Sequence, residues 1–128
     1  MIHIRLPFKT PTINHLYWHM RKTGIKVMTT EAKKLRLDIE EICHPFVEDA
    51  ELFEDKRLSV NIWIVENWIT LDGKIKKVDI MNREKFLVDS VFKGLGLDDK
   101  QIWDITLFKE QDIGPEHCII QIKEASKS

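Results

Sequence analysis

The chain has 128 residues, 43% of them hydrophobic and 32% charged, and its formal net charge is −1. This composition is typical of a soluble globular protein with one core and excludes a disordered chain. No apolar run approaches the roughly 20 residues of a membrane span, and the N-terminus lacks the apolar stretch and cleavage site of a signal peptide. The net charge argues against nonspecific binding to a polyanion, although basic residues gather between residues 21 and 36 and between residues 74 and 85.

The only cysteines are Cys43 and Cys118, and each has a histidine beside it. Two cysteines are too few for a disulfide scaffold, which favours a reducing, cytoplasmic setting. A zinc site usually spaces its ligands two or more residues apart, whereas these pairs are directly adjacent. We therefore expect two ordinary buried thiols beside half-exposed imidazoles.

The first half of the chain predicts a strand, a long loop and a helix. Residues 2–6 alternate apolar and polar side chains, as in a half-buried strand, and Pro7 ends it. The loop that follows is rich in aromatic residues, and long loops are usually functional or mobile. Apolar residues at helical spacing then predict a helix from Thr30 to about Cys43, which Pro45 stops.

A strand and a hairpin are predicted next, after an acidic segment at 48–55 that forms a connection or a short helix. Residues 58–64 alternate as in a strand, and Asp72-Gly73 is a tight-turn dipeptide between short arms at 68–71 and 74–78.

The last third of the chain predicts a second helix from Asn82, its N-cap, to about Lys93, followed by strands at 102–108 and 118–122. The order of elements predicts an α+β sheet with helices packed on it, in a single domain over residues 1–124 with a frayed tail at 125–128. Two tryptophans on predicted strands are expected to be core: Trp63 and Trp103.

Three carboxylates flank the second helix: Asp79 precedes it, and Asp98 and Asp99 follow it. A helix of about 12 residues is about 18 Å long, so these groups meet only if the flanking strands return the chain to the same edge. Clustered carboxylates suit Mg²⁺, a hard cation that prefers oxygen ligands. Aspartates at a turn are also common for structural reasons.

One face of the second helix carries Asn82, Lys85 and Asp89. This face is either an exposed stripe with an i,i+4 ion pair or part of a site in which the lysine stabilises charge on a phosphate. The opposite face is expected to be core and consists of Phe86, Leu87, Val91 and Leu95.

The segment from Val78 to Lys85, then Asp89, then Gly96 to Ile102 forms one block of acids, an asparagine and a lysine at fixed spacing. A second block is Leu6-Pro7-Phe8 with the later Pro11, Asn14, Tyr17 and Trp18. Both blocks resemble the RusA-like family of Holliday junction resolvases, over about residues 5–109. The resemblance implies a mixed sheet of about four to five strands with two main helices, and a homodimer whose two active sites face branched DNA.

The resemblance also implies a Mg²⁺-dependent endonuclease, with Mn²⁺ as a possible substitute, that makes paired nicks in four-way junctions. By position, Asp79 and Asp99 are the first and last metal ligands, Lys85 is the catalytic lysine and Asn82 supports it. Two further family acids correspond to Asp89 and Asp98. Candidate contacts to the DNA backbone are the basic residues Lys76, Lys77, Arg83, Arg21 and Lys22.

The chain departs from the family at Met81, where a second metal-binding aspartate is usual. A thioether cannot replace a carboxylate on Mg²⁺. Another acid, such as Asp89, Asp98 or Glu84, then completes the site, or the metal binds weakly, or cleavage is lost and junction binding is kept. The alternatives to a resolvase are thus a noncatalytic junction-binding protein on the same fold and, if the resemblance is accidental, a small interaction module.

Overall fold

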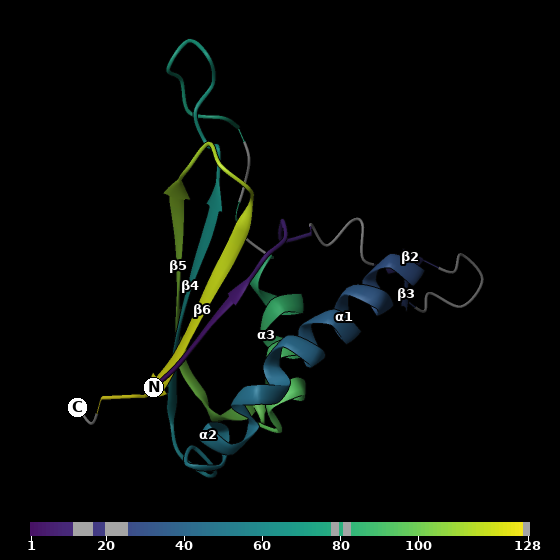
Figure 1. The fold of residues 1–128 in the computed structure, drawn as a ribbon, viewed down its shortest axis with the longest axis vertical. Coiled ribbons are helices and arrows are strands. Elements are labelled where there is room, and N and C mark those ends of the chain that lie inside the picture. The colour runs from purple at the N-terminus through teal and green to yellow at the C-terminus, as the bar shows by residue number, and fades with distance from the viewer. Residues whose placement is uncertain (12–16, 20–25, 78–79, 81–82, 127–128) are drawn as a thin grey trace.

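A computed structural model gives the fold and describes residues 1–11, 17–19, 26–77, 80 and 83–126 (Figure 1). In chain order the elements are β1 (Ile2–Leu6), β2 (Tyr17–His19), β3 (Lys26–Met28), α1 (Thr30–Cys43), η2 (His44–Phe46), α2 (Val47–Glu51), β4 (Leu58–Glu66), α3 (Glu84–Leu95), η3 (Asp99–Gln101), β5 (Ile102–Gln111) and β6 (His117–Glu124). The helices lie on one side of the main sheet (Figure 1).

The main sheet has four strands in the order β1-β6-β4-β5. Its pairs are antiparallel except for β4 with β5, which are parallel. Strands β2 and β3 form a separate antiparallel pair within the predicted long loop. The predicted α+β class, with a mixed sheet and two main helices, α1 and α3, is confirmed.

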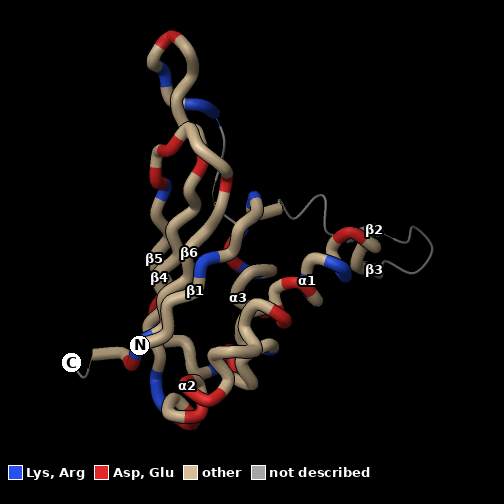
Figure 2. The backbone as a smooth tube through the Cα atoms, in the orientation of Figure 1, with Lys and Arg blue, Asp and Glu red and all other residues tan. Residues whose placement is uncertain are grey.

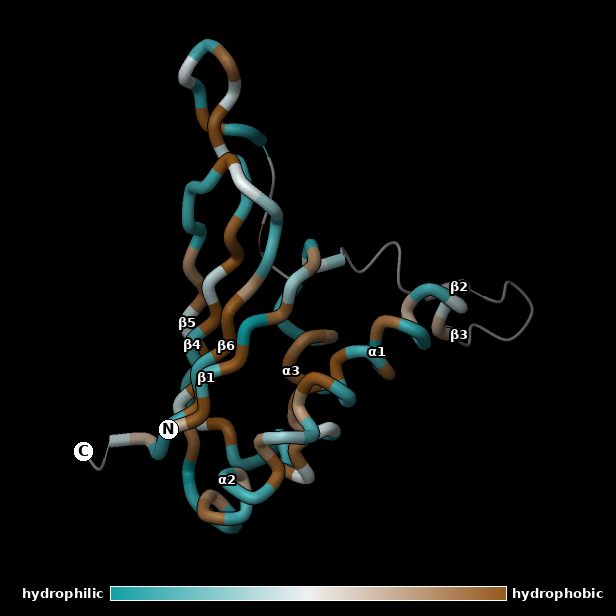
Figure 3. Tube along the Cα trace, in the orientation of Figure 1, coloured by the Kyte–Doolittle hydropathy of each residue, from teal (hydrophilic) through white to brown (hydrophobic). Residues whose placement is uncertain are grey.

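The core lies between the sheet and the two main helices. Because side chains alternate along a strand, β4 buries Leu58, Val60, Ile62 and Ile64 on the face that packs against the helices. The predicted apolar face of α3 is buried there too, and Figure 3 shows apolar residues along these facing elements.

Both thiols are buried in this core, as expected. Burial raises the pKa of Cys43 to about 12 and that of Cys118 to about 11, so both remain protonated and unreactive near neutral pH.

A parallel pair needs a crossover connection, and here the crossover contains α3. The helix ends at Gly96, whose φ of 74° belongs to the left-handed region, and the chain then turns back into β5. Gly94 lets α3 approach α1 closely, because a Cβ there would lie 3.0 Å from the Cα of Glu40. The crossover therefore brings the end of α3 and the start of β5 together on the helix-covered side of the sheet.

The first helix follows its prediction closely. Thr29 is its N-cap, and the hydroxyl oxygen accepts a hydrogen bond from the Ala32 N–H at 3.2 Å. After Cys43 the chain continues into the short η2 turn that contains Pro45. The predicted hairpin is present as a turn at Gly73, with a single bridge between Ile69 and Ile75.

Three details of the predicted elements were wrong. Helix α3 begins at Glu84 with Arg83 at the N-cap position, in place of Asn82. Trp103 is 65% exposed because β5 is the sheet edge, and the Arg57 guanidinium lies 4.9 Å from the centre of its ring. Trp63, also predicted to be core, is only half-buried: it lies on the uncovered sheet face, where it stacks on Phe108 with ring centroids 5.2 Å apart.

Of the predicted tail, Ala125 donates a backbone hydrogen bond to the Arg57 carbonyl at 2.8 Å, and residues 127–128 lie outside the described part of the chain. Among the helices of the described residues, none has the length and apolar character needed to span a membrane.

Candidate active site

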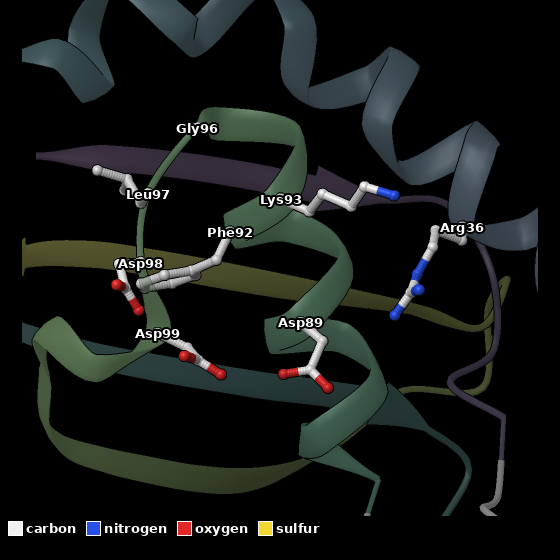
Figure 4. A pocket seen from close by; sticks show the side chains of 8 residues that line it. All are labelled: Arg36, Asp89, Phe92, Lys93, Gly96, Leu97, Asp98 and Asp99. Carbon is white, nitrogen blue, oxygen red and sulfur yellow. The ribbon is translucent and has the colours of Figure 1, made fainter. Parts of the chain in front are cut away.

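Two carboxylates from different elements meet beside α3. Asp89 projects from the middle of the helix and Asp99 from the turn that enters β5. Their side chains point to the same side of the helix (Figure 4) and lie within hydrogen-bonding reach of each other. The crossover produces this meeting, because the left-handed turn at Gly96 returns the chain alongside the helix.

The electrostatics of this pair are unfavourable. Partial burial raises the pKa of Asp89, and the nearby negative charge of Asp99 raises it further. The positive charges of Lys85 and Arg36 oppose these effects without cancelling them. The protein thus holds two like charges together, an arrangement that a bound cation would relieve.

The acid pair lies where two open grooves meet. One groove, of about 560 Å³, is lined by Arg36, Phe92 and Lys93 together with both acids (Figure 4). The other, of about 400 Å³, is lined by Glu84, Lys85 and Ile105 with the same acids. A polyanion that crosses both grooves would therefore pass over the carboxylates and between basic side chains.

Lys85 is exposed and lies one helical turn before Asp89, as the shared helix face predicts. It is near enough for its charge to lower the pKa of Asp89. Its neighbour Glu84 lines the same groove, and Oε2 of Glu84 is buried with no hydrogen-bond partner among the residues described. This groove is therefore lined by both a basic and an acidic side chain.

Arg36 also lines the site, although no motif in the sequence points to it. Its Nε donates to the Ser90 hydroxyl at 3.4 Å and its guanidinium lies 5.8 Å from the Phe86 ring. These contacts aim the side chain toward Asp89 (Figure 4). The sequence contained one indication of this position. Arg36 has helical spacing from the buried Ala32 and Ile39, so it lies on the same side of α1 and close to the neighbouring helix.

Asp98 has a structural role. Its Oδ1 accepts a hydrogen bond from the Lys100 N–H at 2.9 Å, and Gln101 Oε1 accepts one from the Asp98 N–H at 3.1 Å. Gln101 in turn donates to the Phe53 carbonyl at 2.8 Å. This capping box fixes the turn that presents Asp99. Of the two adjacent acids, Asp98 therefore stabilises the turn, whereas Asp99 faces Asp89.

The basic candidates fall into three groups. Lys76 is half-buried and Lys77 exposed, both on the return limb of the hairpin. Arg83 is only 3% exposed and donates to Oε1 of Glu66 at 2.8 Å, so its guanidinium faces the interior and the expectation of a DNA contact is corrected. Arg21 and Lys22 lie outside the described residues, as do the site candidates Asp79, Met81 and Asn82.

The donor set around Asp89 and Asp99 fits Mg²⁺. Proteins commonly hold this ion with one or two carboxylates, while waters and substrate phosphates complete the octahedron. Within the described ranges no three acids, histidines or cysteines gather closely enough to hold a metal. A site built here would therefore use the acid pair, water and any further ligand from the segment that contains Asp79.

Comparison with known proteins is consistent with this arrangement. A family model described as Endodeoxyribonuclease RusA matches residues 7–123, nearly the whole chain. A search of curated proteins finds no match. The family consists of nucleases that resolve Holliday junctions and generally depend on a divalent metal. By its sequence over this span and by its fold, the chain belongs to the RusA endodeoxyribonuclease family.

Proposed function

We propose that this protein is a Mg²⁺-dependent endonuclease that cuts four-way DNA junctions by paired nicks and acts as a homodimer. The observation that carries the proposal is the meeting of Asp89 and Asp99 between two grooves, with Lys85 on one side and Arg36 on the other. Paired nicks need two equivalent sites, which a twofold-symmetric dimer supplies.

In the proposed site, Asp79 and Asp99 hold the metal, with Asp89 as an additional acid. When bound, Mg²⁺ supplies a Lewis acid for the scissile phosphate and lowers the pKa of a coordinated water. Lys85 places a positive charge beside the phosphate and stabilises the additional negative charge that develops on its oxygens. Asn82 is the supporting residue, and Asp98 maintains the turn at Asp99.

DNA is proposed to cross both grooves. Arg36 and Lys93 would contact phosphates on one side of the acids, and Lys85 would contact them on the other. Lys76 and Lys77, with Arg21 and Lys22, remain proposed contacts to the DNA backbone. Such contacts position a protein without reading base sequence, which suits a nuclease that selects DNA by shape.

Met81 favours a second candidate function, a junction-binding protein that does not cut. The chain lacks a carboxylate there. Glu84 and Asp89 are the acids best placed to compensate, because they line the groove that contains Lys85. We favour the nuclease, because the meeting of Asp89 and Asp99 beside Lys85 places oxygen ligands for a cation next to a residue that can stabilise charge on a phosphate.

The test is cleavage of a labelled four-way junction with Mg²⁺, with Mn²⁺ and with EDTA, beside a linear duplex of the same sequence. The variants are Asp79→Asn and Lys85→Ala, and Asp49→Asn on exposed α2 is the matched control. We expect paired, metal-dependent cuts in the junction only, lost in both site variants and kept in the control.

Tight junction binding without cutting under either metal would support the second candidate. Absence of both junction binding and cutting would contradict both functions. A Lys85→Ala protein that loses binding together with cutting would assign the lysine to DNA binding and not to the chemical step.

A further inference from the structure

Residues 67–77, here called the arm, project beyond the end of the sheet at which β4 and β5 finish (Figure 1). The arm joins β4 to the segment that precedes α3, and that segment contains Asp79. Its projection away from the core (Figure 1), and its connection in sequence to the segment that contains Asp79, are the starting point for assigning it a role.

The base of the arm is anchored in the protein. Trp68 is 5% exposed, and its Nε1–H donates to the Ile64 carbonyl at 3.1 Å. Its ring lies 5.5 Å from the Arg83 guanidinium and 4.8 Å from the Lys109 amine. The backbone N–H of Trp68 also donates to Gln111 Oε1 at 2.6 Å. The arm is therefore fixed relative to both α3 and β5.

The tip of the arm is equally well defined. Thr70 N–H donates to the Lys74 carbonyl at 2.7 Å, and Gly73 N–H donates to the Thr70 carbonyl at 2.9 Å. The Thr70 hydroxyl hydrogen-bonds to Asp72, which lowers the pKa of that carboxyl and keeps it ionised. These bonds close the turn at the tip of the arm.

This ordered tip presents aliphatic side chains to solvent. Leu71 is fully exposed, at 111% of its reference area, and Ile75 is 77% exposed. Neither contributes to the hydrophobic core, so burial within this chain does not explain them. An aliphatic side chain at the end of a stiff projection suits insertion into an apolar space on a partner.

The charge of the arm favours a polyanion such as DNA as that partner. Three lysines, Lys74, Lys76 and Lys77, stand against the single acid Asp72 in a chain of net charge −1, and Figure 2 shows basic residues along the arm. Proteins that kink DNA insert aliphatic wedges between base steps while basic side chains hold the phosphates. At a branch point the continuous base stack of a duplex is already interrupted, so separating the bases there costs less than within a linear duplex.

We propose that the arm is a wedge that inserts Leu71, with Ile75 behind it, between bases at the branch point of the junction, while Lys76 and Lys77 contact the adjacent phosphates. The proposal rests on the proposed function, because it assigns the arm to the same DNA substrate. It adds a source of selectivity for branched over linear DNA that the acid pair and its grooves do not supply.

The test compares the wild-type protein with the double variant Leu71→Ser/Ile75→Ser. The matched control is Leu52→Ser, which removes a leucine that is 74% exposed at the end of α2. All three side chains are exposed, so the variants should melt as the wild type does. The substrate is a four-way junction with 2-aminopurine at the branch, because the fluorescence of this base rises when it unstacks; binding is measured without added metal and cleavage separately.

We expect the wild type and the control to raise the fluorescence on binding and the double variant not to. The double variant should bind the junction about tenfold more weakly while its affinity for linear duplex changes less than about twofold. Equal fluorescence and affinity in all three proteins, with cleavage intact, would overturn the wedge and leave the proposed function standing.

An equal loss of linear and junction binding in the double variant would also overturn the wedge, because the arm would then be a general DNA contact. A wild-type protein that neither prefers nor cuts the junction would overturn the proposed function and the wedge together.

Discussion

One charge pair lies at the N-terminal end of α3 and another at its middle, and the two differ in both charge and exposure. At the N-terminal end, Arg83 and Glu66 carry opposite charges 2.8 Å apart, with side chains only 3% and 7% exposed. In the middle of the helix, Asp89 meets Asp99, a like charge, at an open surface. The first pair is neutral and closed to solvent, whereas the second is charged and accessible.

The difference separates structural charges from functional ones. A buried ion pair is tolerated when each charge satisfies the other, and this one joins the end of β4 to the start of α3. Two adjacent carboxylates repel each other when both are ionised, and a cation supplied from outside would relieve that repulsion. Lys85 belongs with the open pair and Arg83 with the closed one, although only one residue lies between them.

Breaking the closed pair is expected to have the largest effect. Arg83→Met leaves Glu66 buried without its cation, and the free energy of unfolding should fall by about 3–5 kcal/mol. Replacing both residues, as Glu66→Leu/Arg83→Met, should recover much of that loss, since no isolated charge remains. Denaturant unfolding measures both values; a single variant within about 1 kcal/mol of the wild type would contradict the structural assignment.

Removing a charge from the open pair should affect catalysis and not folding. Asp99→Asn should lower single-turnover junction cleavage by about 100- to 1000-fold, because it removes a carboxylate proposed to hold the metal. Its thermal stability should match or exceed that of the wild type, since the repulsion with Asp89 is lost. An Asp99→Asn protein that unfolds more easily but cuts normally would move this acid to the structural class.

Periodicity predicted most of the fold, while the assignment of these charges needed the tertiary structure. The alternation over residues 58–64 and the helical spacing in α1 and α3 could be recognised from the sequence alone, because each pattern indicates which face of its element is buried. The different burial of Arg83 and Lys85 depends on tertiary structure, because Glu66 of β4 pairs with Arg83 while Lys85 is exposed. The same holds for Trp103, whose exposure depends on β5 being the sheet edge.

The site was predicted in part. The spacing and family resemblance selected Lys85, Asp89 and Asp99, which the fold gathers at one surface. Arg36 comes from α1, more than 50 residues earlier than Asp89, so its approach depends on how α1 packs against α3. Long-range packing of this kind leaves only a weak trace in the sequence.

Adding a carboxylate where the family usually has one should strengthen the open site. Met81→Asp is expected to raise Mg²⁺ affinity about tenfold, or about 1.4 kcal/mol, because it adds a hard oxygen ligand. Calorimetric titration measures the affinity. Met81→Asn is the matched control, because asparagine is polar and of the same size as aspartate but has no negative charge. Unchanged affinity in the aspartate variant, or an equal gain in the asparagine variant, would contradict the placement of the metal.

The smallest expected effect is on the free energy of unfolding, which the Asp89 carboxylate lowers when it is ionised. Its folded-state pKa is raised, by burial first and then by Asp99, so the folded protein favours the protonated carboxyl more than the unfolded chain does. Stability is therefore lost as pH rises from the ordinary value of 3.8 through the raised pKa, and Asp89→Asn should remove that loss. The side chain is partly exposed and solvent screens the repulsion, so the gain above this window should be only about 0.5 kcal/mol, or about 1–4 °C in Tm.

Thermal melts of the wild type and Asp89→Asn across pH 3 to 8 measure this difference. It should vanish at the acid end, where both proteins carry an uncharged side chain, and reach a plateau near neutral pH. Millimolar Mg²⁺ should then close or reverse the gap, because a cation bound between Asp89 and Asp99 stabilises only the protein that keeps both carboxylates. A gap that is independent of pH, or one that Mg²⁺ leaves unchanged, would mean that this acid pair is an ordinary surface feature and not the site of a metal.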